Sequence, residues 1–134
     1  MIYGIGHDVL EISRISALMK GRLRDKFMER VLTAREIELG LCRERRLPEY
    51  LAGRFSAKEA IVKAFGCGIG EVIGFTDIEV VPNELGKPEV ILSAEAWSRL
   101  NLPKGQNYKI HLTITHERHL ASAFAVVEQE MSSL

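Results

Sequence analysis

One helical segment of this chain carries charged side chains where a buried face is expected. Residues 54–66 read as a helix, and apolar residues around it mark a buried stripe at Leu51, Phe55 and Val62. Glu59 follows Phe55 by four residues and Lys63 follows Glu59 by four, so both lie on one face beside that stripe. Burying a carboxylate and an ammonium is costly unless a metal or a phosphate compensates them. An ordinary surface pair worth ~0.3 kcal/mol is the alternative.

A second carboxylate, Asp8, favours the chemical interpretation. The first residues read as a short strand at about 2–6 that contains Gly4 and Gly6. Glycine weakens a strand unless a backbone or a ligand must approach it closely. Asp8 follows directly, and its alternative role is a turn residue or a cap for a helix that begins near Ser13.

The remaining pattern predicts an α+β domain, with helices in the first half and strands in the second. Thr33 and Glu36 have capping-box spacing, Pro48 suits the first turn of the central helix, and Gly66 suits its end. Expected helices are 13–20, 22–30, 34–45 and the central one, with a short helix after Ser93. Expected strands are 75–81, 87–92, 108–115 and 120–128. Short turns between the strands imply mostly antiparallel pairing.

The glycine-rich stretch 66–70 invites comparison with a phosphate-binding loop. It follows a helix instead of joining a strand to a helix, so the dinucleotide fingerprint does not apply. We interpret it mainly as a helix cap and a loop.

Composition excludes several classes of function. The chain has 134 residues, and 18 Lys and Arg balance 18 Asp and Glu, so nothing indicates nucleic-acid binding. No apolar run reaches membrane-spanning length, and no signal-peptide pattern opens the sequence. Cys42 and Cys67 form neither a disulfide framework nor a metal cluster, and free, partly buried thiols suit a reducing compartment. We expect a cytoplasmic protein.

Positive charge is concentrated near the N-terminus. Residues 14–30 contain six basic and two acidic side chains, and the basic ones are Arg14, Lys20, Arg22, Arg24, Lys26 and Arg30. Such a segment is either a solvated helix face or a docking surface for an acidic partner, where complementary charge raises the association rate.

The two segments together resemble the signatures of the phosphopantetheinyl transferases. These signatures are Gly4-Ile5-Gly6-His7-Asp8 and Phe55-Ser56-Ala57-Lys58-Glu59-Ala60-Ile61-Val62-Lys63. The opening residues 1–6, Gly86-Lys87-Pro88 and Ile114-Thr115-His116 resemble the short, trimeric branch of that family. The resemblance spans nearly the whole chain and implies a single transferase domain over 1–134. It also implies a fold in which helices pack on a mainly antiparallel sheet.

The resemblance implies transfer of the 4′-phosphopantetheine arm of coenzyme A to a serine of apo-acyl carrier protein, in support of fatty acid biosynthesis. Asp8 and Glu59 are then the ligands of Mg²⁺, which takes one or two carboxylates plus phosphate oxygens. Lys63 would stabilise charge that develops on the phosphate. The base that takes the serine proton is Glu59 or a water on the metal that Glu59 activates.

Further roles are implied for residues outside the two signatures. Gly66, Pro88 and Thr115 resemble the positions that line the nucleotide. A second set resembles the positions that meet its 3′-phosphate, namely Arg46, Arg54 and His116. Arg14, Arg22 and Arg24 match the segment that meets the carrier protein. The family further implies a homotrimer whose active sites lie between subunits.

Two positions depart from the pattern of the family. His7 stands where relatives carry a smaller or aliphatic residue, and it either tunes Asp8 or points away. Leu85 stands where asparagine is frequent. A non-catalytic binder of coenzyme A or of the carrier protein is the competing hypothesis, and it would not need Asp8, Glu59 and Lys63 together. A plain structural domain leaves their coincidence unexplained.

Overall fold

The computed structural model describes residues 1–131, apart from the side chain of Glu44. The helices and strands follow one another in the order β1 (Ile2–Glu11), α1 (Ile12–Met19), α2 (Arg24–Val31), α3 (Ala34–Leu41), α4 (Leu47–Phe65), β2 (Ile78–Pro82), β3 (Pro88–Leu92), α5 (Ala94–Leu100), β4 (Gln106–His116) and β5 (Leu120–Met131). Two 3₁₀ turns, η1 (Glu44–Arg46) and η2 (Phe75–Asp77), precede α4 and β2. The expected α+β class is confirmed.

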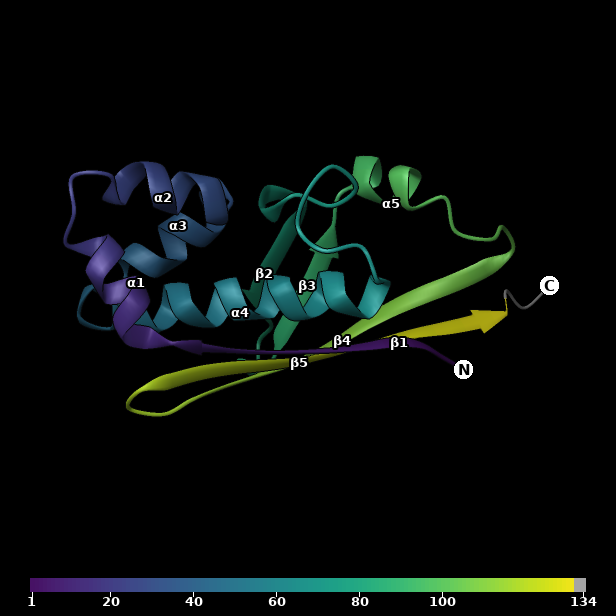
Figure 1. Cartoon of the computed structure of the whole chain (residues 1–134). Coiled ribbons are helices and arrows are strands. Elements are labelled where there is room, and N and C mark those ends of the chain that lie inside the picture. The colour runs from purple at the N-terminus through teal and green to yellow at the C-terminus, as the bar shows by residue number, and fades with distance from the viewer. Residues whose placement is uncertain (132–134) are drawn as a thin grey trace.

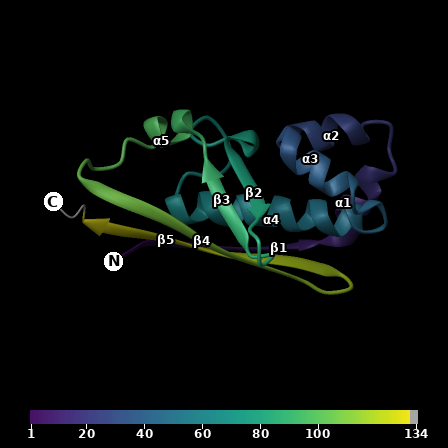
Figure 2. The same ribbon diagram turned by 180° about the vertical axis from the view of Figure 1, so that it is seen from behind.

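The strands form two antiparallel sheets with α4 at the centre of the molecule. One sheet has three strands in the order β1-β5-β4, and the other is the β2–β3 hairpin. Helices α1, α2 and α3 gather around the first half of α4, whereas β2, β3 and α5 surround its second half (Figure 1). The β2–β3 hairpin lies behind α4 in Figure 1 and in front of it in Figure 2.

Because neighbours surround α4, it is buried on most of its circumference. One apolar core joins Ala60 and Ile61 of α4 to the inner faces of both sheets, where Ile78 and Val127 are fully buried. A second core joins Leu51 of α4 to the three N-terminal helices. The helix thus connects the sheet end of the molecule to the helical end.

Several expected boundaries differ from the structure. The first strand does not stop near residue 6 but continues through both glycines to Glu11, paired along its length with β5. The helix from Ala34 ends at Leu41 instead of near Arg45, because Arg43 and Arg46 donate backbone hydrogen bonds three residues back and form tighter turns. The strand expected from Phe75 begins at Ile78, after a turn that Asp77 caps.

The predicted caps are confirmed. Thr33 and Glu36 form the capping box of α3, Gly66 ends α4 in a left-handed conformation, and Ser93 caps α5. Both cysteines are free but exposed, so the expected partial burial was wrong. Within residues 1–131, no helix combines the length and the apolar character that crossing a membrane requires.

Candidate functional site

The glycines of β1 let this strand touch the backbone of α4. A Cβ added to Gly6 would lie 1.9 Å from the carbonyl oxygen of Ala60, and one added to Gly4 would lie 1.9 Å from that of Ala64. No side chain fits in such a space, so the close approach anticipated from the sequence is that of another backbone segment. The contact places Asp8, two residues beyond Gly6, against the side of α4.

Asp8 is bound by two side chains of α4. Its Oδ2 accepts a hydrogen bond of 3.0 Å from the hydroxyl of Ser56, and its Oδ1 lies 3.3 Å from Nζ of Lys63. Lys63 also donates to the backbone oxygen of His7 at 3.0 Å. Among the described residues, Lys63 forms its ion pair with Asp8 rather than with Glu59, so the simple surface pair within the helix is not what forms.

Glu59 completes a cluster of two carboxylates and one ammonium. Its side chain is half-buried, and burial raises its pKa first, the negative charge of Asp8 raises it further, and Lys63 lowers it. Two carboxylates that repel each other in this way favour a cation between them. Within residues 1–131, no group of three or more His, Cys, Asp or Glu is placed to hold a metal. A pair of carboxylates is a donor set that suits Mg²⁺, because this ion is usually bound by one or two carboxylates together with substrate phosphates and water.

The fully buried charge of α4 is Lys58, not Glu59, and the sequence analysis assigned Lys58 no role. Its ammonium lies 2.6 Å from Oε1 of Glu36 and donates to the backbone oxygens of Val31 and Phe75 at 2.7 and 3.0 Å. Lys58 occupies the stripe position three residues after Phe55, a spacing that was visible in the sequence. This ion pair connects the N-terminal helices to α4. Because both side chains are fully buried, neither of them faces a substrate.

Three of the predicted site residues gather in a second place. Arg46, Arg54 and His116 line one small cavity of about 90 Å³, together with Arg43, Glu49, Tyr50, Gly53 and Ile114. The guanidinium of Arg54 lies 4.5 Å above the ring of Tyr50, and burial lowers the pKa of Arg54. Its Nε is buried and has no hydrogen-bond partner among the described residues. Excess positive charge and a free donor are the features that suit a pocket to an anion. Sequence reasoning missed Arg43 and Tyr50.

The two clusters lie on opposite sides of α4. Asp8 of β1 and Ile114 of β4 both pair with Ala123 of β5, so they stand at the two edges of the three-stranded sheet, about 10 Å apart. Helix α4 crosses above these paired residues, with Ser56 hydrogen-bonded to Asp8 and Gly53 packed against Ile114. The helix therefore separates the carboxylates from the arginine pocket within one chain.

The other expected nucleotide contacts are dispersed. Gly66 follows Lys63 by three residues at the end of α4, with φ of 82°. Pro88 opens β3 and lines a cavity of about 540 Å³ between β3 and β4. Thr115 is exposed, and neither it nor Pro88 lines the arginine pocket.

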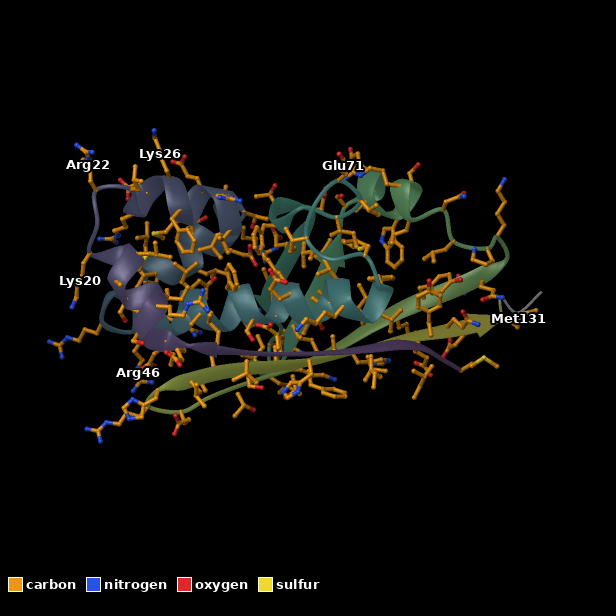
Figure 3. The ribbon with its side chains drawn as sticks, viewed as in Figure 1. Lys20, Arg22, Lys26, Arg46, Glu71 and Met131 are labelled. Atoms are coloured by element: carbon orange, nitrogen blue, oxygen red, sulfur yellow. The ribbon has the colours of Figure 1, made fainter. Side chains whose placement is uncertain are left out.

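The basic segment forms an exposed surface at the helical end. Arg14 lies on α1, Arg22 lies in the turn before α2, and the half-buried Arg24 is the first residue of α2. The side chains of Lys20, Arg22 and Lys26 project outward in Figure 3. A groove of about 500 Å³ runs between α1, α2 and the start of α4. Leu18 and Leu23 expose about half of their surface or more beside these charges. The surface offers an acidic, partly apolar partner both kinds of contact.

The outer face of the three-stranded sheet is apolar in its middle. Ile5, Val9 and Phe124 are 59%, 54% and 40% exposed. His7 also lies on this face, where its Nε2 is 2.9 Å from the hydroxyl of Ser122. His7 therefore points away from the carboxylates, which was one of the two alternatives for this residue.

Known proteins resemble this chain over nearly its whole length. A sequence model of the 4'-phosphopantetheinyl transferase superfamily matches residues 4–124. A holo-[acyl-carrier-protein] synthase of Bacillus cereus (strain G9842) is 44% identical over 129 residues, which are 96% of this chain and 97% of the relative.

Solved structures agree. A holo-(acyl-carrier-protein) synthase of Bacillus anthracis, in complex with CoA (3',5'-ADP), has 41% identity and a TM-score of 0.78, with 95% of this chain and 96% of that chain covered. The synthase of Neisseria meningitidis has 37% identity and a TM-score of 0.82, with 96% and 99% covered.

Proposed function

Because this chain belongs to the 4'-phosphopantetheinyl transferase superfamily, and within it to the holo-[acyl-carrier-protein] synthases, we propose that Asp8, Glu59 and Lys63 are its catalytic centre. The reaction moves the 4'-phosphopantetheine arm of coenzyme A to a serine of apo-acyl carrier protein and releases adenosine 3',5'-bisphosphate. The observation that carries this assignment is the contact between β1 and α4, which brings two carboxylates and an ammonium together.

Asp8 and Glu59 would hold Mg²⁺ between them. When bound there, the ion neutralises charge on the pyrophosphate of coenzyme A. Removal of one carboxylate would leave a single ligand on the protein, too few to fix the position of the ion. The hydrogen bond from Ser56 holds the Asp8 carboxylate against α4, the helix that carries Glu59.

The protein side chains then divide the work of the transfer. The serine oxygen of the carrier attacks the β-phosphorus, and the bond from that phosphorus to the bridging oxygen breaks. Glu59 takes the serine proton, either directly or through a water, and its raised pKa suits that task. Lys63 donates to the phosphate oxygens on which charge develops. Its present bonds to Asp8 and His7 keep the ammonium at the cluster.

Coenzyme A would be held by the residues outside the catalytic cluster. Arg46, Arg54 and His116 would bind its 3′-phosphate in the arginine pocket, and Gly66, Pro88 and Thr115 would line the nucleotide. Because α4 stands between the pocket and the carboxylates of one chain, we infer that one coenzyme A molecule uses the pocket of one subunit and the carboxylates of its neighbour. The apolar outer face of the sheet supports a homotrimer built in this way.

The carrier protein would dock on the basic surface of α1 and α2 through Arg14, Arg22 and Arg24. The acidic helix of a carrier complements this charge, and the exposed leucines beside it supply apolar contact. We place the reaction in the cytoplasm, as a step that supports fatty acid biosynthesis.

Intact-protein mass spectrometry of an apo-acyl carrier protein tests the proposal. After incubation with this protein, coenzyme A and Mg²⁺, the carrier should gain the mass of one phosphopantetheine arm, and a chelator should prevent the gain. The same gain with Asp8→Ala or Glu59→Ala would refute the assigned centre. No gain with several carriers, despite tight binding of coenzyme A, would identify a non-catalytic binder.

A further inference from the structure

The arginine pocket contains an aromatic ring where an ion pair would be expected. Arg54 is mostly buried, and a buried guanidinium needs compensation for the water that it loses. A carboxylate would supply that compensation but would also cancel the positive charge. The face of Tyr50, 4.5 Å from the guanidinium carbon, attracts the cation through its quadrupole and leaves the net charge unchanged.

We propose that Tyr50 is a positioning residue that holds Arg54 and Arg43 ready for a phosphate monoester and thereby sets the preference for coenzyme A over dephospho-coenzyme A. The inference rests on the proposed binding of the 3′-phosphate in this pocket. The guanidinium of Arg43 also lies over the same ring, 5.8 Å from its centre. One aromatic side chain thus orients two cations toward one cavity.

Two contacts fix the ring of Tyr50. Its hydroxyl donates a 2.7 Å hydrogen bond to the backbone oxygen of Glu36, and burial raises the pKa of Tyr50, so the donor keeps its proton. Gly40 of α3 leaves room for the ring edge, because a Cβ at Gly40 would lie 2.7 Å from it. The ring is therefore held in one position beside the two arginines.

The charge around the cavity matches a dianion. Arg43, Arg46 and Arg54 line it together with His116, and the carboxylate in the lining is that of Glu49. That carboxylate lies 3.9 Å from the ring nitrogen of His116, and among the described residues it forms no ion pair with Arg54. The buried Nε of Arg54 is free to donate to a phosphate oxygen. Dephospho-coenzyme A, which lacks the 3′-phosphate, would leave these cations without an anionic partner.

Steady-state kinetics with two donors test the proposal. With coenzyme A and dephospho-coenzyme A compared at a saturating carrier concentration, the wild-type protein should prefer coenzyme A. Tyr50→Leu removes the ring and should reduce that preference by about 3- to 30-fold, through a higher KM for coenzyme A. The kcat/KM for dephospho-coenzyme A should stay the same.

A matched control separates positioning from stability. Phe75 is partly buried, whereas Tyr50 is buried, and it packs on the ring of Phe55 at 5.2 Å without lining the pocket. Phe75→Leu should lower the melting temperature without changing the ratio of the two donors. An unchanged ratio in Tyr50→Leu would overturn the proposal. A wild-type protein that treats both donors alike would instead overturn the binding of the 3′-phosphate in this pocket.

A series of fluorinated phenylalanines at position 50 keeps the test decisive should the leucine variant fold poorly. Phenylalanine, difluorophenylalanine and pentafluorophenylalanine fill similar space while their ring quadrupole weakens. The KM for coenzyme A should rise along this series, and that for dephospho-coenzyme A should not. A flat series would show that the ring acts only as filler.

Discussion

Replacement of Gly6 by alanine should separate the strand that carries Asp8 from the helix that carries its partners. The added Cβ would lie 1.9 Å from the Ala60 oxygen and 2.8 Å from the Ala64 nitrogen, whereas real Cβ contacts stay above 3.0 Å. Both obstacles are backbone atoms of a buried helix, so no change of rotamer relieves the clash. The strand must retreat by about 1 Å, which is the shift that the 3.0 Å limit requires.

The displacement should affect catalysis more than stability. A retreat of β1 carries Asp8 away from Lys63 and Glu59, and a misplacement of about 1 Å at a reacting centre can lower the rate by ~10²-fold. Overpacking of this kind also lowers the free energy of unfolding by about 1–3 kcal/mol. The variant should therefore remain folded in mild conditions while its kcat falls.

The assay is holo-carrier formation measured beside urea unfolding. Gly70→Ala is the matched control, because a Cβ at Gly70 meets nothing within 4 Å and its φ lies outside the left-handed region. Gly70→Ala should keep the wild-type rate and the wild-type urea midpoint. A wild-type kcat in Gly6→Ala would refute the argument that this backbone contact positions Asp8.

Four further predictions concern other parts of the structure. Asp8→Ala or Glu59→Ala should lower the rate of holo-carrier formation at saturating Mg²⁺ by about 10²-fold or more with little change in the urea midpoint, and a wild-type rate from either would end the assignment. Arg14→Glu should raise the KM for the carrier several-fold and leave that for coenzyme A alone, so an unchanged carrier KM removes Arg14 from the docking surface. Lys58→Met leaves the Glu36 carboxylate buried without its cation and should lower the free energy of unfolding by about 3–5 kcal/mol. Adding Glu36→Gln to that variant should recover part of the loss, and strictly additive losses in urea titrations would contradict the coupling. In the metal-free protein, an NMR titration should give Glu59 a pKa above its ordinary 4.5, which Asp8→Asn or Mg²⁺ should lower. Because the pKa of Glu59 is raised in the folded state, this carboxyl contributes to the free energy of unfolding in a pH-dependent way. The contribution is fully present below the pKa that the group has in the unfolded state, and it is lost as the pH rises through the pKa of the folded state. No response to Asp8→Asn would show that the two carboxylates do not interact.

Local patterns predicted most of the fold correctly because their causes are local. The capping box of Thr33 and Glu36, the glycine end of α4 and the serine cap of α5 depend on hydrogen bonds within a few residues. Alternation over Ile78 and Val80 likewise shows which face of a strand is buried, and both residues are buried. The elements expected from these signals are present.

Boundaries that depend on distant partners were less predictable. The sequence predicted that the first strand ends near residue 6, but β1 continues because β5 pairs with it as far as Glu11. The glycines indicated a close approach by a backbone or a ligand, but the spacing within the strand could not show that the neighbour is the backbone of α4. Lys58 shows the same limit, since its partner Glu36 lies 22 residues away on another helix.

The sequence by itself determined which chemistry is available: two carboxylates, a lysine, a set of arginines and a basic segment, in an order that resembles one family of transferases. Tertiary structure decided how these groups are used. Lys63 bonds to Asp8 on a distant strand instead of to Glu59 on its own helix, and Tyr50 stands where Arg54 would otherwise need a carboxylate. The physical reason is that hydrogen bonds, charge interactions and close contacts depend on distance in space. Helix α4, pressed against β1 on one side and β4 on the other, sets those distances.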